Sequence, residues 1–126
     1  RNFHAMYQLL AHAHDDTSDY FQNTLKLHGS AAVCDHWRYL TFSSAREVEN
    51  IDDKRDYDDV ITALQALHFT QNEMNSVWRL VAAVLYFGNI QFSKGLKDEA
   101  IISDVQALTT AAEIALLNTD ALTEGL

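Results

Sequence analysis

The stretch that decides the fold runs from residue 70 to residue 92 and reads TQNEMNSVWRLVAAVLYFGNIQF. Thr70 followed by Glu73 is a capping box, in which each side chain accepts a hydrogen bond from the backbone amide of the other residue at a helix start. Apolar residues then recur every three or four positions, which predicts a one-sided helix that ends at Gly88. The expected buried stripe consists of Met74, Val77, Trp78, Val81 and Leu85. After Gly88, Ile90 and Phe92 alternate with polar residues, which predicts a short strand.

Three more helices are predicted before this stretch. The first is already running at Arg1 and ends in the polar segment 12–18; its apolar stripe is Phe3, Met6, Tyr7 and Leu10. A short helix is expected over residues 19–27, with Gly29 as its stop. Asp53 is expected to cap the third helix, whose stripe is Tyr57, Val60, Ile61, Leu64 and Leu67. Segment 30–50 has no regular period and predicts a loop, held to the core by Trp37, Tyr39, Leu40 and Phe42.

The carboxyl-terminal part predicts a β-hairpin followed by two helices. Residues 93–99 are expected to form an exposed loop, and residues 100–102 the strand that pairs back. Ser103 with Gln106 repeats the capping-box pattern and opens a helix with the stripe Val105, Leu108, Ala112 and Leu116. Thr119 is expected to cap a last helix. The predicted fold class is therefore mainly α with one small β-hairpin, and the length fits a single domain.

Composition limits the classes of partner. The chain of 126 residues has no proline, the strongest helix breaker, and its net charge is −9. Such an acidic surface repels phosphates and anionic lipid, so neither nucleic acid nor a membrane is an expected partner. The single cysteine, Cys34, cannot form an internal disulfide, which suits a reducing compartment. No apolar run reaches the ~20 residues that a membrane span needs, and we expect a cytoplasmic protein.

Five blocks of the sequence resemble the myosin motor domain. RNFH and YQLL within residues 1–10 resemble the signature that follows the switch I strand. Asp52, Asp53, Asp56 and Tyr57 resemble paired aspartates before a helix, and ALQALHFT at 63–70 resembles the next stretch. The strongest match is WRLVAAVLYFGNIQF at 78–92. The last block resembles the helix pair that comes next in the family; its matching residues are Ala112, Leu116, Leu117, Asp120 and Leu122.

The resemblance implies that residues 1–126 are a fragment of one myosin motor domain, in the upper 50-kDa subdomain after switch I. The parent motor would hydrolyse ATP with Mg and pull on actin filaments of the cytoskeleton. This segment would carry movement from the nucleotide switch to the actin-binding surface. It has no Gly-Lys-Ser/Thr phosphate loop and neither switch element, so alone it is expected to have no catalysis, no nucleotide-binding residue and no cofactor. Tyr86, segment 12–14 and segment 114–115 depart from the family pattern, and the myosin class stays undetermined.

Three clusters could carry independent chemistry, and for each we favour a structural interpretation. His12 and His14 in HAHDD have the residue types of metal ligands, but residues two apart on a helix face different ways. The aspartates within 52–56 are typical of a helix start, where carboxylates cap free amides. Cys34, beside an aspartate and a histidine, is expected to be an ordinary cysteine, and Trp37 and Trp78 core aromatics. We therefore predict no catalytic and no metal-binding residue.

Lys94 and Lys97 are the candidate site residues. In myosins the loop after this strand can touch actin, which is acidic, so two lysines on the tip would add electrostatic steering. The alternative is a solvated hairpin tip with ordinary charges. For the whole chain, the alternative function is a free-standing helical protein-interaction module without enzymatic activity. A metal-dependent hydrolase built on His12 and His14 is a third and remote possibility.

Overall fold

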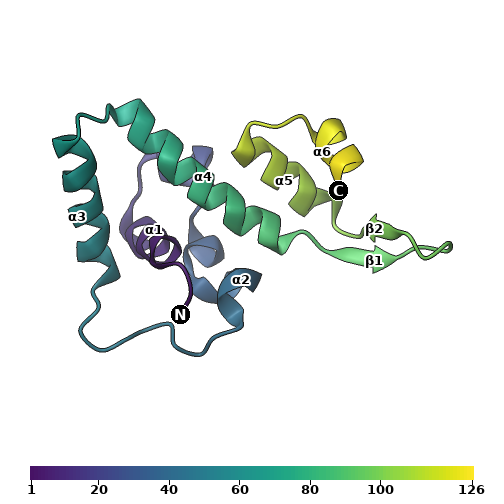
Figure 1. Ribbon diagram of the computed structural model, residues 1–126, viewed down its shortest axis with the longest axis horizontal. Helices are drawn as coiled ribbons and strands as arrows, with labels where there is room; N and C mark the ends of the chain where they lie inside the picture. Colours follow the sequence, from purple (N-terminus) through teal and green to yellow (C-terminus); the bar gives the residue numbers. More distant parts are fainter.

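A computed structural model describes all residues 1–126 and shows a mainly helical chain with one two-stranded antiparallel sheet (Figure 1). The α-helices are α1 (His4–Asp15), α2 (Arg38–Thr41), α3 (Asp53–Ala66), α4 (Gln71–Asn89), α5 (Val105–Ala115) and α6 (Thr119–Gly125). The strands are β1 (Phe92–Lys94) and β2 (Ala100–Ile102). A π-helical turn, η1 (Tyr20–Thr24), and two 3-10 turns, η2 (Gly29–Ala32) and η3 (Cys34–His36), lie between α1 and α2. The predicted fold class is confirmed.

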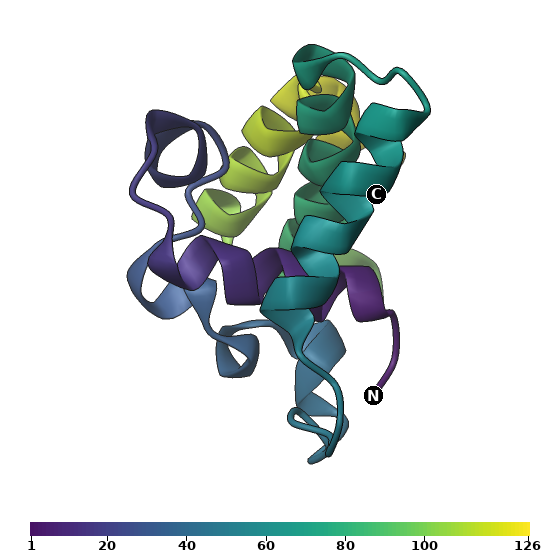
Figure 2. The ribbon, with the colours of Figure 1, turned by 90° about the vertical axis from the view of Figure 1, so that its left-hand side faces the viewer.

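Helix α4 runs through the molecule and connects its two ends. Helices α1 and α5 pack against α4, while α3 packs on α1 and α6 packs on α5; Figure 1 shows the hairpin projecting beyond the end of α4. In Figure 2, α1 lies across α3 and α4 rather than along them, which lets one helix contact both. None of the helices combines the length and the apolar character that a bilayer crossing requires.

The capping box at the start of α4 is confirmed. The amide of Glu73 donates to the Thr70 hydroxyl at 3.3 Å, and the amide of Thr70 donates to the Glu73 carboxylate at 2.7 Å. The expected stop at Gly88 is wrong, because α4 continues to Asn89. A Cβ at Gly88 would lie 2.4 Å from the ring of Tyr39, so this glycine makes room for an aromatic ring and does not end the helix.

The core is built around aromatic contacts between helices. Tyr57 of α3 stacks on His12 of α1 at a centroid distance of 4.0 Å and on Trp78 of α4 at 4.5 Å. In a second group, Trp37 meets Tyr86 edge-on at 4.8 Å, and its indole N–H donates to the Ala31 carbonyl. Trp37 and Trp78 are both buried, which confirms them as core residues.

Several predicted core positions are exposed. The buried face of α4 is centred on Trp78, Ala82 and Leu85, so Val77 lies at its edge and is exposed. Of the four residues expected to hold segment 30–50, only Trp37 and Leu40 are buried. Tyr39 and Phe42 are exposed, and so are four further predicted positions at the ends of their elements: Phe3, Leu67, Val105 and Leu116.

Three helix caps lie one residue from the predicted position. Asp52, not Asp53, accepts from the Arg55 amide, since Asp53 instead pairs with Arg1 at 2.6 Å. Asp104 caps α5 in place of Ser103, whose amide extends the hairpin by donating to the Gln91 carbonyl at 2.9 Å. Asn118 caps α6, and Thr119 is the first residue of that helix.

The segment between α1 and α3 also differs from its prediction. Helix α1 continues through most of the polar stretch, to Asp15. The expected helix over 19–27 is a π-helical turn, and Lys26, in the left-handed region at φ 54°, follows it. Gly29 begins η2 rather than stopping a helix, and segment 30–50 contains short helices where a loop was expected. These turns are too short for a hydrophobic period to be visible in the sequence.

Candidate functional site

The β-hairpin is the element that leaves the helical body. Phe92 pairs with Ile102, Ser93 with Ile101, and Lys94 with Ala100. The strand pairing was predicted and is confirmed, but Ser93 and Lys94 belong to β1, so the turn spans only 95–99. The candidate site residues are Lys94, the last residue of β1, and Lys97, in the turn; both are exposed.

The turn between the strands is held by several internal contacts. The Gly95 amide donates to the Glu99 carbonyl at 2.7 Å, and the Lys97 amide donates to the Glu99 carboxylate, also at 2.7 Å. The ammonium group of Lys94 forms an ion pair with Asp98. Asp98 adopts the left-handed conformation at φ 64°. The tip is therefore a defined turn, and one of its two lysine charges has an acidic partner.

The base of the hairpin is fixed to the helices by polar contacts. The Asn89 side chain accepts from the Arg38 amide and donates to the His36 carbonyl, each at 2.9 Å. These bonds join the end of α4 to η3 and α2. Asn89, Arg38, His36 and Asp104 also line a hollow beside the hairpin base. Asn89 and Asp104 already bond to backbone amides there, so they serve to position the hairpin.

The other side of α4 is tied to α5. The Arg79 guanidinium donates to the carbonyl oxygens of Ile114 at 2.6 Å and Glu113 at 3.0 Å, at the end of α5. The Glu113 carboxylate pairs with Lys26 at 2.5 Å. Positive side chains at a helix carboxyl end complement the helix dipole. The hairpin is thus flanked by two helices whose relative position is set by named contacts.

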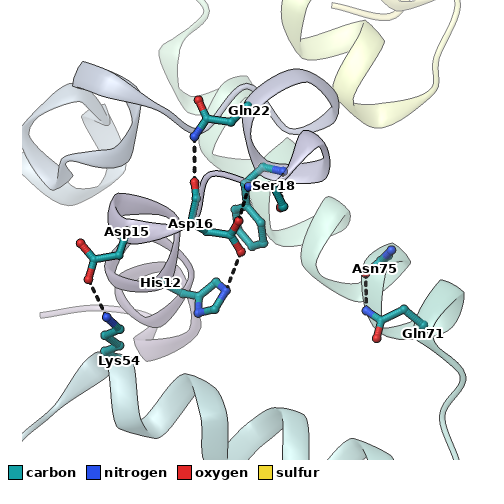
Figure 3. A network of polar contacts seen from close by, with 9 residues as sticks. His12, Asp15, Asp16, Ser18, Gln22, Lys54, Gln71 and Asn75 are labelled. Atoms are coloured by element: carbon teal, nitrogen blue, oxygen red, sulfur yellow. Dashed lines mark hydrogen bonds and ion pairs between the residues drawn. The ribbon is translucent and has the colours of Figure 1, made fainter.

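A polar network lies at the opposite end of the molecule, where α1 ends (Figure 3). The Asp16 carboxylate contacts the His12 ring nitrogen Nε2 at 3.0 Å and accepts from the Ser18 amide at 2.6 Å. Gln22 donates to the Asp16 carbonyl at 2.7 Å. Burial raises the pKa of Asp16, but hydrogen bonds from Ser18 and His12 outweigh it and hold the pKa below its usual value. This network fastens the end of α1 to the turn that follows.

A second contact in Figure 3 joins α1 to α3. Lys54 and Asp15 form an ion pair at 2.5 Å. Hydrogen bonds from Lys54 and then from His14 lower the pKa of Asp15 from 3.8 to about 2. Both side chains are exposed, so the pair adds little to stability.

The structure separates the two histidines of the candidate metal site. His12 contacts Asp16 and stacks on Tyr57, whereas His14 contacts Asp15 at 2.9 Å. No group of three or more histidine, cysteine, aspartate or glutamate side chains is arranged to hold a metal ion. The HAHDD segment therefore acts as a helix end with two separate acid–histidine pairs.

The remaining candidates for chemistry have structural partners. Of the aspartates in segment 52–56, Asp52 caps α3 and Asp53 pairs with Arg1. Cys34 is half-buried, and burial raises the pKa of its thiol, which disfavours the thiolate that a nucleophile needs. Its neighbour Asp35 pairs with Arg46 at 2.5 Å. The nearby carboxylates of Asp35 and Asp53 are therefore each paired with an arginine.

Two features of the site were missed by the sequence reasoning. Leu96, at the tip of the hairpin, is fully exposed. An isolated apolar residue in a polar turn, between two lysines, was the available signal. Tyr86, which departs from the family pattern, uses its hydroxyl to donate to the carbonyl oxygens of Leu25 at 3.0 Å and Lys26 at 2.9 Å. It holds the chain where Lys26 takes its left-handed conformation.

Comparison with known proteins identifies the class. The model of the myosin head (motor domain) family matches residues 1–126. The chain is 37% identical over 117 residues to the myosin ID heavy chain of Dictyostelium discoideum, covering 93% of this chain and 10% of that protein. It is 33% identical over 114 residues to the unconventional myosin ID of Drosophila melanogaster, and 31% identical over 131 residues to myosin-5 of Arabidopsis thaliana. These matches cover 90% and 100% of this chain, and 10% and 8% of those proteins.

The chain belongs to the myosin head (motor domain) family. It spans about a tenth of the length of the curated relatives that it matches. The predicted resemblance to a myosin motor domain is confirmed.

Proposed function

We propose that this chain is part of an actin-based, ATP-driven motor and that its helices connect the nucleotide switch region to the actin-binding surface. Membership of the motor-domain family supports the proposal. The segment itself contains no Gly-Lys-Ser/Thr phosphate loop, so ATP and Mg would bind elsewhere in the parent motor and this segment alone would not catalyse hydrolysis. Its partners would be the rest of the heavy chain and, through the motor, the actin filament of the cytoskeleton.

The observation that carries the proposal is the uninterrupted helix α4. It has 19 residues, which at 1.5 Å per residue corresponds to about 28 Å. Its first half is joined to α1 through the stack of His12, Tyr57 and Trp78. Its far end leads into the hairpin and is fixed by Asn89. A movement of α1 would therefore reach the hairpin through packed rings and one stiff helix, with only residues 90–91 between the helix and β1.

The hairpin is the proposed actin-facing element, with Lys94 and Lys97 near its tip. It projects from the body, so a filament could reach it without displacing a helix (Figure 1). The remainder of the chain is acidic overall, and an acidic filament would be repelled by most of its surface. Lys94 is paired with Asp98, so Lys97 is the lysine placed to offset that repulsion over the short range of screened charges, about 8 Å at physiological salt.

The test uses the intact protein with and without actin filaments. We expect ATP turnover that filaments accelerate, and we expect Lys97→Glu to weaken filament binding at low salt. Arg55→Glu is the matched control, since it reverses one charge at an exposed position of α3, away from the hairpin. Turnover without any effect of Lys97→Glu would argue against the actin-facing role. An intact protein with neither turnover nor filament binding would fit the free-standing helical interaction module.

A further inference from the structure

The hollow beside the hairpin base has a volume of about 400 Å³ and is lined by three parts of the chain. They are η3 with the start of α2, the end of α4 with the residues leading into β1, and the first turn of α5. Only two of its nine lining residues are hydrophobic. An apolar partner would leave the polar groups without hydrogen bonds, at a cost in free energy, so the hollow suits a polar ligand.

Arg38, which lines this hollow, is the arginine without a partner for its side chain. Arg1, Arg46 and Arg55 each pair with an aspartate, and Arg79 donates to two carbonyl oxygens of α5. Arg38 is bonded only through its backbone, although the chain has 18 acidic residues and 9 basic ones. Its guanidinium charge is therefore available to a ligand in the hollow.

Further hydrogen-bond donors line the same hollow. The ring of His36 packs edge-on against Trp37 at a centroid distance of 4.7 Å, and its nitrogens make no hydrogen bond. Gln91 and Gln106 contribute primary amides, of which only that of Gln106 has a contact, at 3.4 Å to the Thr110 hydroxyl. Guanidinium, imidazole and amide N–H groups are all donors, and an oxyanion is the ligand that accepts from several of them at once.

The walls of the hollow are held in place before any ligand arrives. The Asn89 side chain accepts from the Arg38 amide and donates to the His36 carbonyl, so one residue fixes the backbone of both. A site whose parts are already positioned loses less entropy on binding. Asp104 is the one acidic residue of the lining, and its carboxylate accepts from the Ala107 amide at the start of α5. That carboxylate limits the hollow to a single anionic group.

We propose that this hollow binds one oxyanion group, a carboxylate or a phosphate, with the Arg38 guanidinium as its main contact and His36 and Gln106 as further donors. The inference goes beyond the proposed function and does not depend on any contact between the hairpin and actin. Charge-assisted hydrogen bonds of this kind are about twice as strong as neutral ones. A bound oxyanion would join η3 and α2 to the start of α5, and so stiffen the base of the hairpin.

The experiment measures how fast phenylglyoxal, a reagent for accessible guanidinium groups, labels each arginine of the intact protein. Mass spectrometry of the peptides gives a separate rate for Arg38 and for Arg55, the exposed arginine of α3 that serves as the control. Labelling is compared in inorganic phosphate, in acetate and in chloride, all at the same ionic strength. A rate for each arginine keeps the result independent of anions bound elsewhere in the protein.

We expect phosphate or acetate to slow the labelling of Arg38 roughly 5-fold at about four times the dissociation constant, because the bound anion covers the guanidinium. The rate at Arg55 should not change. Protection by phosphate alone would assign the site to a phosphate group, whereas protection by acetate as well would assign it to carboxylates and phosphates alike. Both results support the inference.

A variant tests whether the donors act together. His36→Ala should raise the anion concentration needed for half-protection of Arg38 about 10-fold, since it removes a hydrogen bond to a charged group. His28→Ala is the matched control, because His28 is also an exposed histidine and does not line the hollow. It should leave the half-protection concentration unchanged. His36 is exposed, so its truncation should leave the fold intact.

Four results would overturn the inference. Equal labelling of Arg38 in all three salts would show that no oxyanion binds there. Equal protection of Arg38 and Arg55 would show only weak association with any exposed arginine, and so would an unchanged half-protection concentration in His36→Ala. Slow labelling of Arg38 in chloride would show that another part of the intact protein already covers the hollow. Filament binding and ATP turnover could persist in every one of these cases, so the proposed function would be tested separately.

Discussion

The helical body and the hairpin are stabilised in different ways. In the body, formed by α1, α3 and the first half of α4, aromatic rings stack between helices and large side chains are fully buried. In the hairpin, β1 has no buried side chain and β2 has only one that is partly covered. Its shape comes from the strand pairing and from the bonds made by Glu99.

This difference determines what each region can do. A body held by burial resists deformation, because interiors are close-packed and lose energy when a cavity opens. A hairpin held by its own backbone bonds keeps its side chains free for a partner. The same chain thus combines a stiff connector with an exposed contact element, and substitutions in the two regions should have opposite consequences for stability and for binding.

The largest effect is expected from Trp78→Ala in the body. Trp78 is buried and stacks on Tyr57, so its truncation should cost about 3–5 kcal/mol of unfolding free energy. The measurement is denaturant unfolding of the intact protein, together with hydrogen exchange of the α4 amides. Trp78→Phe should cost clearly less, since the indole N–H has no hydrogen-bond partner to lose. Unchanged amide protection in Trp78→Ala would show that the stack does not hold the body together.

A smaller effect is expected when the two structural glycines are compared. Gly88→Ala would place a Cβ 2.4 Å from the Tyr39 ring, and we expect a cost of about 1–3 kcal/mol. Gly95→Ala in the hairpin meets the ends of the Glu99 and Ile101 side chains, which can turn away, so its cost should be lower. The unfolding midpoints of both variants, compared with that of the wild type, measure the two costs. Adding Tyr39→Ala should relieve the Gly88→Ala penalty; equal costs at the two glycines would contradict the comparison.

The smallest effect is expected at the ion pair between α1 and α3. The folded pKa of Asp15 is about 2, below its ordinary 3.8, so its contribution is present above pH 4 and is lost as the pH falls towards 2. Asp15→Asn should therefore be slightly less stable than the wild type at pH 7, with the difference vanishing near pH 2. Thermal unfolding across this pH range measures it. A difference for Asp15→Asn that stays constant across this pH range would rule out the linkage.

The sequence predicted the helices better than their ends. The capping box of Thr70 and Glu73 was correct because both halves of the pattern lie in the same short stretch. The caps of α3, α5 and α6 were each wrong by one residue, since two neighbouring polar residues could cap in each case. At α5, Ser103 is drawn into the hairpin by Gln91, which comes from a distant part of the chain. The residues next to Ser103 in the sequence do not show whether it will cap α5 or extend the hairpin.

The hairpin that carries the candidate site was predicted, but the contacts within its turn were not. The hairpin and its lysines were located from the alternation of apolar residues and the turn between them. The neutral charge of the tip was already present in the composition, yet the pairing of Lys94 with Asp98 depends on how the turn folds. Leu96 could have been noticed in the sequence, but its complete exposure and the bonds that fix its neighbours required coordinates.

By itself, the sequence determined the family, the helical class, the hairpin and the two buried tryptophans, because these follow from local periodicity and from motifs of adjacent residues. Only the tertiary structure decided that Gly88 accommodates Tyr39 and that α1 lies across α3 and α4. It also decided that His12 and His14 contact different aspartates. The physical reason is that each of these outcomes depends on contacts between segments far apart in the chain. Local propensity carries no information about which distant side chain will occupy the space beside a residue.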